Sequence, residues 1–484
     1  MKSRGRDAFA LAIVAVLGWV TAAAAATQNP APSITVETGT LAGSVEGGVE
    51  SWKGIPFAAP PIGPLRWRAP QPAAPWNGVR QATAYGNDCM QKPSSMGIVP
   101  RLGSPPAEDC LYVNVWRPAA AAAKLPVLVW IFGGGFVNGG SSQPVSSGAN
   151  LARQGVLVVS FNYRVGRFGT FAHPQLTQQN ADGGLLGNYG YMDQIAALKW
   201  VQRNIAAFGG DPANVTLFGE SAGGRSINTL VTSPMAQGLF AKAVIMSGGD
   251  GHSANVGDLA QAEQIGVLFA AGKGIPADDP NALTRLRALS ADDVVGGLNL
   301  EVMFTARPPT YGFPFVDGRI AVDSGTALRT GAFAKVPTMI GATSADLAGR
   351  TGYMLTGARN TATTIAAAGV PVYAYRFSYV AESAERRDGA GHATDIPFFF
   401  DTVDVRYQEK TTPRDRGMSK AMSTYLVNFA KSGDPNDGKL PVWPRYSRAT
   451  DVIVNFAEDG TVVPQKDPWG AELDAAGSPA PPGR

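Results

Sequence analysis

The run Gly219-Glu220-Ser221-Ala222-Gly223 constrains the fold more than any other stretch of the chain. An apolar strand, Val215–Phe218, leads directly into it, and a candidate helix begins at Arg225. So tight a turn from strand to helix leaves no room for Cβ atoms on its flanks, and the two glycines let Ser221 project with its hydroxyl exposed. The pattern predicts a nucleophilic serine at the end of a buried strand.

Other apolar runs predict more strands of the same kind. They are Leu111–Trp116, Val127–Phe132, Val156–Phe161, Ala243–Met246, Val336–Ile340 and Val372–Phe377. Helix-length segments lie between several of them, and Asp193–Ala207 carries apolar residues at helical spacing. Ile34–Gly54, with short apolar runs and glycine pairs, predicts antiparallel hairpins. We therefore expect an α/β fold with a large, mostly parallel sheet covered by helices on both faces.

The two ends of the chain differ from its middle. Residues 1–26 resemble a secretory signal, with basic residues, then the apolar run Phe9–Val20, then small residues up to Ala26. That run is too short to span a membrane comfortably, so we expect cleavage near Ala26 and a soluble protein exported to the periplasm or the medium. We expect a single domain over 27–475 and a disordered tail over 476–484.

The charge of the chain argues against two classes of partner. The formal net charge is +3, and the predicted leader contributes Lys2, Arg4 and Arg6. The mature chain is therefore close to neutral, and we expect neither nucleic acid nor an anionic membrane as a partner. No phosphate loop, HExxH motif or paired CxxC occurs, so we expect no metal and no organic cofactor. The residues do not indicate an oligomeric state.

The chain has two cysteines, Cys89 and Cys110, on either side of a loop rich in proline and serine. After export to an oxidising compartment, such a pair favours a disulfide over two buried free thiols.

Three histidines are candidates for the base that a serine nucleophile needs. In α/β folds with this kind of serine turn, the acid and the histidine follow the serine in the chain. His173 precedes Ser221, and we expect it at the surface. His252 follows the strand that ends at Met246, but this chain order disfavours it. His392 follows the last strongly apolar strand and is the predicted base.

The acid is expected after the strand that precedes the histidine. Asp346 follows the strand Val336–Ile340, and its role would be to accept the histidine Nδ1 proton and to stabilise the imidazolium. A loop aspartate that caps a turn is the alternative. The position after the strand favours the catalytic role.

A glycine triplet, Gly133-Gly134-Gly135, follows the strand Val127–Phe132. Backbone N–H groups of such a loop, together with the amide of Ala222, predict an oxyanion hole beside Ser221. The alternative is a turn without a function.

Beyond the serine turn, the chain resembles the type B carboxylesterases, which are large α/β-hydrolases that include bacterial esterases and cholinesterases. The resemblance covers about Ile34 to Asp467. Its matching stretches are Gly54-Ile55-Pro56-Phe57-Ala58, Pro64-Leu65-Arg66-Trp67, Glu108–Trp116, Asn162-Tyr163-Arg164, Phe208–Val215 and Asn428–Asn436.

The resemblance implies an α/β-hydrolase fold and an enzyme that hydrolyses small to medium carboxylic esters through an acyl-enzyme. It implies Ser221 as nucleophile, Asp346 as acid, His392 as base, Gly134, Gly135 and Ala222 as oxyanion donors, supporting roles for Glu220 and Ser247, and a disulfide between Cys89 and Cys110. The substrate would be a small-molecule ester.

The chain departs from the family pattern at three places. Phe132 stands where many members have histidine, and Asp346 where most have glutamate. The region between Gly349 and Pro371 is shorter than usual, so we expect a more open site with looser substrate discrimination. Two other functions stay open: a binding protein of the same fold whose site has decayed, and an amidase, lactonase or carbamate hydrolase that uses the same triad.

Overall fold

The computed structural model describes residues 31–96, 101–120, 124–250, 257–305, 309–384 and 388–477. The chain separates at Pro32, and Pro32–Arg484 holds every element described below. The predicted leader, residues 1–26, lies outside the described residues, as do residues 478–484 of the predicted tail. The last helix, α14 (Gly470–Ala476), extends one residue into the region predicted as tail.

The central sheet of the described residues is 11-stranded, in the order β16-β15-β14-β13-β12-β11-β9-β10-β8-β4-β3. Its strands are β3 (Ser44–Glu46), β4 (Val49–Pro56), β8 (Tyr112–Pro118), β9 (Leu125–Ile131), β10 (Leu157–Phe161), β11 (Gly210–Glu220), β12 (Lys242–Met246), β13 (Thr338–Thr343), β14 (Val372–Phe377), β15 (Val452–Phe456) and β16 (Val462–Lys466). All neighbours from β15 to β10 pair in parallel, whereas β16, β8, β4 and β3 pair antiparallel. The predicted mostly parallel sheet is therefore confirmed.

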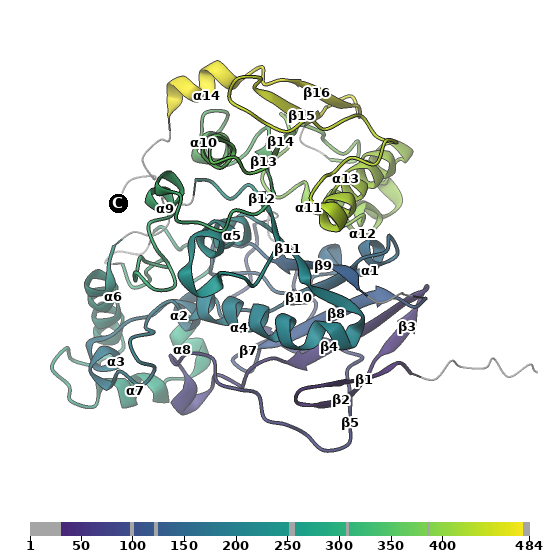
Figure 1. Ribbon diagram of the computed structural model, residues 1–484. Coiled ribbons are helices and arrows are strands. Elements are labelled where there is room, and N and C mark those ends of the chain that lie inside the picture. The colour runs from purple at the N-terminus through teal and green to yellow at the C-terminus, as the bar shows by residue number, and fades with distance from the viewer. Residues whose placement is uncertain are drawn as a thin grey trace, which may run out of the picture. The chain divides into compact units, whose positions relative to one another are not determined.

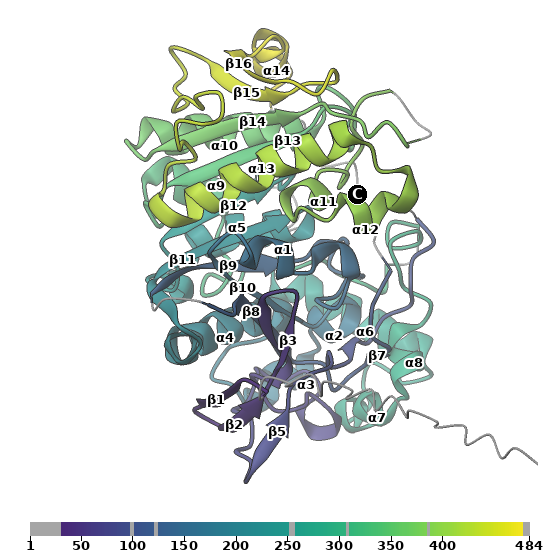
Figure 2. The same cartoon turned by 90° about the vertical axis from the view of Figure 1, so that its right-hand side faces the viewer.

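The parallel strands are buried on both faces, as their continuous apolar sequences predict. β10 and β12 are buried at every position. Figures 1 and 2 show α1 (Ala149–Ala152) and α13 (Pro413–Ser432) on one face of the sheet, and α4 (Tyr189–Asn204), α5 (Ala222–Thr232) and α10 (Tyr353–Ala367) on the other.

The remaining helices surround this core. They are α2 (Gly166–Gly169), α3 (Pro174–Gln179), α6 (Leu259–Gly272), α7 (Ala282–Ala288), α8 (Ala291–Val295), α9 (Ser324–Thr330), α11 (Ile396–Phe399) and α12 (Val403–Tyr407). Within the described ranges, none of the helices combines the length and the apolar character that a membrane crossing needs.

The antiparallel start of the chain is confirmed. β1 (Ser33–Val36) and β2 (Gly39–Ala42) form a hairpin, and β3 pairs antiparallel with β4. β2 also pairs in parallel with β5 (Val79–Gln81).

Three predicted helix boundaries were wrong. The helix after the serine turn begins at Ala222, not at Arg225, because the turn passes into α5 without a linker. The helix predicted over Asp193–Ala207 begins at Tyr189 and ends at Asn204, and the tighter turn Ile205–Phe208 follows it.

An aromatic cluster holds the segment after His392 against the sheet. The rings of Trp130 in β9 and Phe218 in β11 lie 4.9 Å apart, and Phe400, directly after α11, lies 4.9 Å from Trp130 and 5.1 Å from Phe218. Such pairs contribute about 0.5–1.5 kcal/mol each beyond their buried area. The cluster thus fixes the chain that follows His392 to the strands that lead to the glycine triplet and to Ser221.

The start of α13 connects this helix to the chain beyond β14. Thr412 and Asp415 form a capping box, in which each side chain accepts a hydrogen bond from the backbone N–H of the other. The carboxylate of Asp415 also accepts a hydrogen bond of 2.7 Å from the hydroxyl of Tyr379, just after β14. α13 therefore helps to position the loop that leads to His392.

The disulfide joins Cys89 to Cys110. Cys89 belongs to the short strand β6 (Asp88–Cys89), which pairs with β7 (Pro106–Ala107). Both cysteines are buried. The bridge joins the two ends of the loop between residues 89 and 110.

Removal of this bridge should destabilise the fold. It joins residues 21 positions apart, and the chain-entropy model for a loop of this size gives about 3 kcal/mol in the free energy of unfolding. Denaturant unfolding of Cys89→Ala/Cys110→Ala measures the loss, and reduced wild-type protein is the control. An unchanged midpoint would contradict the prediction.

Candidate active site

The polar groups singled out in the sequence gather at one edge of the sheet. Ser221 follows β11, Ser247 follows β12, Asp346 follows β13, and His392 lies in the loop after β14. Gly133–Gly135 follow β9. Because the carboxyl ends of parallel strands meet at one edge, the topology brings these residues together.

Ser221 lies in a strained turn. Its backbone has φ 56° and ψ −120°, a conformation that side-chain-bearing residues rarely adopt and that costs on the order of 1–3 kcal/mol. A Cβ atom on Gly223 would lie 1.9 Å from the carbonyl oxygen of Ile131, and one on Gly219 would lie 2.7 Å from the same atom. Only glycine fits at these two places, so the turn packs directly on β9.

A chain of hydrogen bonds connects the three predicted catalytic side chains. His392 Nε2 lies 2.8 Å from Ser221 Oγ, and His392 Nδ1 lies 2.6 Å from Asp346 Oδ1. With a neutral imidazole, Nδ1–H donates to the carboxylate, and Nε2 accepts from the serine hydroxyl. His392 and Asp346 are buried, while Ser221 is half-buried. The arrangement can remove a proton from Ser221 and return it.

Asp346 is held by several donors. Its Oδ2 accepts hydrogen bonds from Ser247 Oγ at 2.6 Å and from Thr343 Oγ1 at 2.8 Å, and its Oδ1 accepts one from the N–H of Leu347 at 2.7 Å. Burial raises the pKa of Asp346, but His392 and these donors outweigh burial and hold the pKa below its usual range. Asp346 therefore stays ionised and fixes the ring of His392.

Two further buried carboxyls surround the histidine. Glu220 Oε1 lies 3.2 Å from His392 Nε2. Asp395, three residues after His392, accepts a hydrogen bond of 3.3 Å from the hydroxyl of Tyr375. Burial raises the pKa of Asp395 to about 7. Asp395 was not among the residues predicted from the sequence, although an acid between His392 and the apolar run that begins at Ile396 was a signal for it.

These carboxyls set the charge of the imidazole. Burial by itself lowers the pKa of His392, but Glu220 and Asp346 outweigh burial and raise it well above the usual range. Burial also raises the pKa of Glu220, so Glu220 and His392 compete for one proton. Because Asp346 contacts the other ring nitrogen, it stabilises the imidazolium that forms when His392 takes a proton.

The glycine triplet lies against the serine. A Cβ atom on Gly133 would come within 2.9 Å of the Cβ of Ser221. Gly134 and Gly135 have φ values of 107° and 64°, which turn the backbone sharply. Among the described residues, the backbone N–H groups of Gly134, Gly135 and Ala222 have no hydrogen-bond acceptor. These donors are free to bind an oxygen atom of a ligand.

The other two histidines lie outside this arrangement. The surface position expected for His173 was wrong: the residue is buried, and its Nδ1 accepts a hydrogen bond of 3.2 Å from the N–H of Gln175 at the start of α3. It is a helix cap because it directly precedes Pro174. His252 is outside the described residues. In the part of the chain that the structure describes, no histidines, cysteines or acids form a group that could hold a metal ion.

Known proteins resemble the chain along most of its length. The model of the carboxylesterase family matches residues 30–355 and 350–468. Para-nitrobenzyl esterase of Bacillus subtilis (strain 168) is 33% identical, over 90% of this chain and 96% of that protein. Fumonisin B1 esterase of Sphingopyxis macrogoltabida is 32% identical, over 95% of this chain and 93% of that protein.

A solved structure of PNB esterase superimposes with a TM-score of 0.80 at 30% identity, and covers 93% of this chain and 99% of its own. Sequence and fold thus agree with the resemblance seen in the motifs. The chain belongs to the carboxylesterase family and is a serine carboxylesterase with the α/β-hydrolase fold.

Proposed function

We propose that the protein hydrolyses small to medium carboxylic esters through the triad Ser221, His392 and Asp346. The observation that carries the proposal is the hydrogen-bond chain from Ser221 Oγ to His392 Nε2, at 2.8 Å, and from His392 Nδ1 to Asp346, at 2.6 Å. Nucleophile, base and orienting acid are in the order that acyl transfer requires. An inactive binding protein would have no need of this arrangement.

In the first half of the reaction, His392 takes the proton of Ser221 as the serine oxygen attacks the ester carbonyl. The developing oxyanion accepts hydrogen bonds from the N–H groups of Gly134, Gly135 and Ala222, each worth about 10²–10³ in rate. His392 then gives its proton to the departing alcohol, and an acyl group stays on Ser221.

In the second half, a water molecule takes the place of the alcohol. His392 removes a proton from this water as the water attacks the acyl-enzyme, and the same N–H groups bind the oxyanion. His392 then returns the proton to Ser221, and the carboxylic acid leaves. Asp346 keeps its negative charge throughout and stabilises the imidazolium.

We also propose that the protein is exported. The predicted leader, residues 1–26, supports export, and the bridge between Cys89 and Cys110 suits an oxidising compartment.

We further propose that the site is open on one side. The family match divides between residues 350 and 355, which supports a shortened segment there. The described chain fills this segment with α10 alone, and Tyr353 at its start packs near Gly249 and beneath the guanidinium of Arg225. A short wall gives an acyl chain room to extend.

Replacement of the serine tests the nucleophile. Ser221→Ala should lower kcat/KM for p-nitrophenyl esters by about 10⁴-fold or more, because it removes the hydroxyl that contacts His392 and forms the acyl-enzyme. Ser432→Ala, at the exposed end of α13, is the matched control and should retain full activity. Equal turnover by both variants would contradict the proposed triad. No turnover by folded wild-type protein would favour the binding-protein function.

The pH profile tests the base. Only neutral His392 accepts the serine proton, and its pKa is raised, so kcat/KM should increase with pH along an acid limb above about 6.5. Glu220→Gln removes one of the carboxylates that raise this pKa and should move the limb to lower pH. A limb at or below 6.5 in the wild type, or no shift in the variant, would show that these charges do not control the base.

Acyl chain length tests the open wall. A closed apolar pocket changes kcat/KM by about tenfold or more for one methylene. Here we expect kcat/KM for p-nitrophenyl acetate to octanoate to vary by less than about tenfold in total. Steady-state kinetics across this series measures it, and a sharp optimum at one chain length would contradict the proposal.

A further inference from the structure

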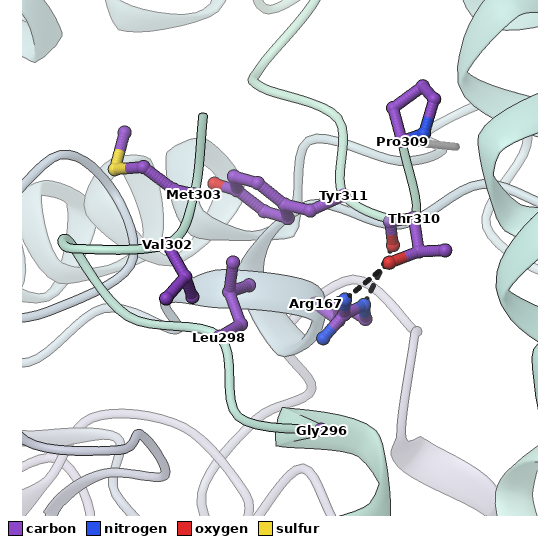
Figure 3. A pocket seen from close by; sticks show the side chains of 8 residues that line it. All are labelled: Arg167, Gly296, Leu298, Val302, Met303, Pro309, Thr310 and Tyr311. Atoms are coloured by element: carbon purple, nitrogen blue, oxygen red, sulfur yellow. Dashed lines mark hydrogen bonds between the residues drawn. The ribbon is translucent and has the colours of Figure 1, made fainter. Parts of the chain in front are cut away.

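A pocket of about 110 Å³ is lined by Arg167 of α2 and by residues of the segment 296–311 (Figure 3). A single water needs about 10–15 Å³ of such space, so the pocket has room for several atoms. Its wall is mostly apolar, with Leu298, Met303 and Tyr311 among the lining side chains. Arg167, from α2, brings a positive charge to this wall, and Thr310 contacts that charge.

Arg167 differs from the other buried arginines in the described residues. Each of the others contacts a carboxylate: Arg66 with Glu108, Arg164 with Asp193, Arg359 with Asp451, and Arg376 with Asp467. Arg167 is 5% exposed, and no carboxylate of the described residues forms an ion pair with it. Burial of an arginine without a counter-charge is costly.

All hydrogen-bond partners of this guanidinium are neutral. Nε donates to the carbonyl oxygen of Thr310 at 2.8 Å, Nη1 donates to those of Val294 and Val295, and Nη2 donates to Thr310 Oγ1 at 2.9 Å. The second N–H of Nη2 has no acceptor among the described residues. Burial lowers the pKa of Arg167 to about 10, so these partners offset only part of the cost.

The pocket shares its wall with the proposed oxyanion loop. A Cβ atom on Gly135 would lie 3.1 Å from the Cε of Met303. The hydroxyl of Tyr311 donates a long hydrogen bond, 3.5 Å, to the carbonyl oxygen of Phe136, the residue after the triplet. A ligand in the pocket would therefore lie close to the loop whose N–H groups we expect to bind the ester carbonyl.

We propose that this pocket binds a carboxylate, with Arg167 as its counter-charge, and that the carboxylate belongs to the substrate. This inference rests on the proposed function, because it makes the preferred substrate an ester with an apolar chain that ends in a carboxylate. The apolar wall would contact the chain, and Arg167 would bind its charged end. Selection would then act on charge more than on size.

A matched pair of variants isolates the charge. Thr310→Asp places a carboxylate beside the Arg167 guanidinium, where the threonine hydroxyl now lies. Thr310→Asn places a neutral amide at the same position, with the same shape as the aspartate side chain. Thr310 is half-buried, and melting temperatures confirm that both variants fold. The substrates are p-nitrophenyl hemiesters of adipate, pimelate and suberate, each compared with the neutral ester of equal length.

The proposal expects Thr310→Asn and the wild type to prefer at least one hemiester over its neutral counterpart by about tenfold in kcat/KM, the size of one charge-assisted hydrogen bond. Thr310→Asp should lose most of that preference. Equal hemiester-to-neutral ratios in the two variants, with no response to free adipate, would overturn the proposal, because a purely structural Arg167 would give that result.

Free adipate distinguishes the two sources of a carboxylate. If the carboxylate belongs to an effector instead, adipate should change the hydrolysis of neutral esters by Thr310→Asn but not by Thr310→Asp, and the hemiester preference should be absent. That result would keep the pocket and overturn its assignment to the substrate.

A binding measurement separates this inference from the proposed function. In the Ser221→Ala background, adipate should raise the melting temperature of Thr310→Asn more than that of Thr310→Asp, with sodium chloride of equal ionic strength as the control. A shift without esterase activity in the wild type would contradict the proposed function alone. Esterase activity without a shift and without a hemiester preference would contradict the pocket alone.

Discussion

The close contact between the serine turn and β9 is the constraint on which the site depends. Cβ atoms on Gly219 and Gly223 would collide with the carbonyl oxygen of Ile131, so the turn can lie against β9 only with glycine at both places. This contact holds Ser221 in its strained conformation and brings it beside Gly133. The folded core supplies the free energy that such strain requires.

The charges buried around His392 and around Arg167 are unbalanced in opposite directions. Around His392, an excess of carboxylates favours the imidazolium, the species that acyl transfer must stabilise. Around Arg167, a positive charge has only neutral partners among the described residues. The first imbalance suits a proton that moves during the reaction. The second suits a negative charge that arrives with a ligand.

The sequence predicted features that depend on neighbours along the chain. Apolar runs located β8 to β14, and the glycines around Ser221 located the turn, because both effects are local. β16 was missed, since Val462–Lys466 is half exposed and alternates poorly. β15 was missed although Val452–Phe456 is mostly apolar and buried. Burial of His173 and the lack of a counter-charge at Arg167 arise from contacts between distant segments, so no local pattern reveals them.

The proposed mechanism requires an acyl group to form on Ser221. Brief reaction with a p-nitrophenyl ester, an acid quench and mass spectrometry of the digested protein can detect this group. We expect one added acyl group on the peptide that contains Ser221, and a longer-lived adduct in Asp346→Asn, which should hydrolyse it more slowly. An adduct on another residue, or rapid turnover without any adduct in either protein, would contradict the mechanism.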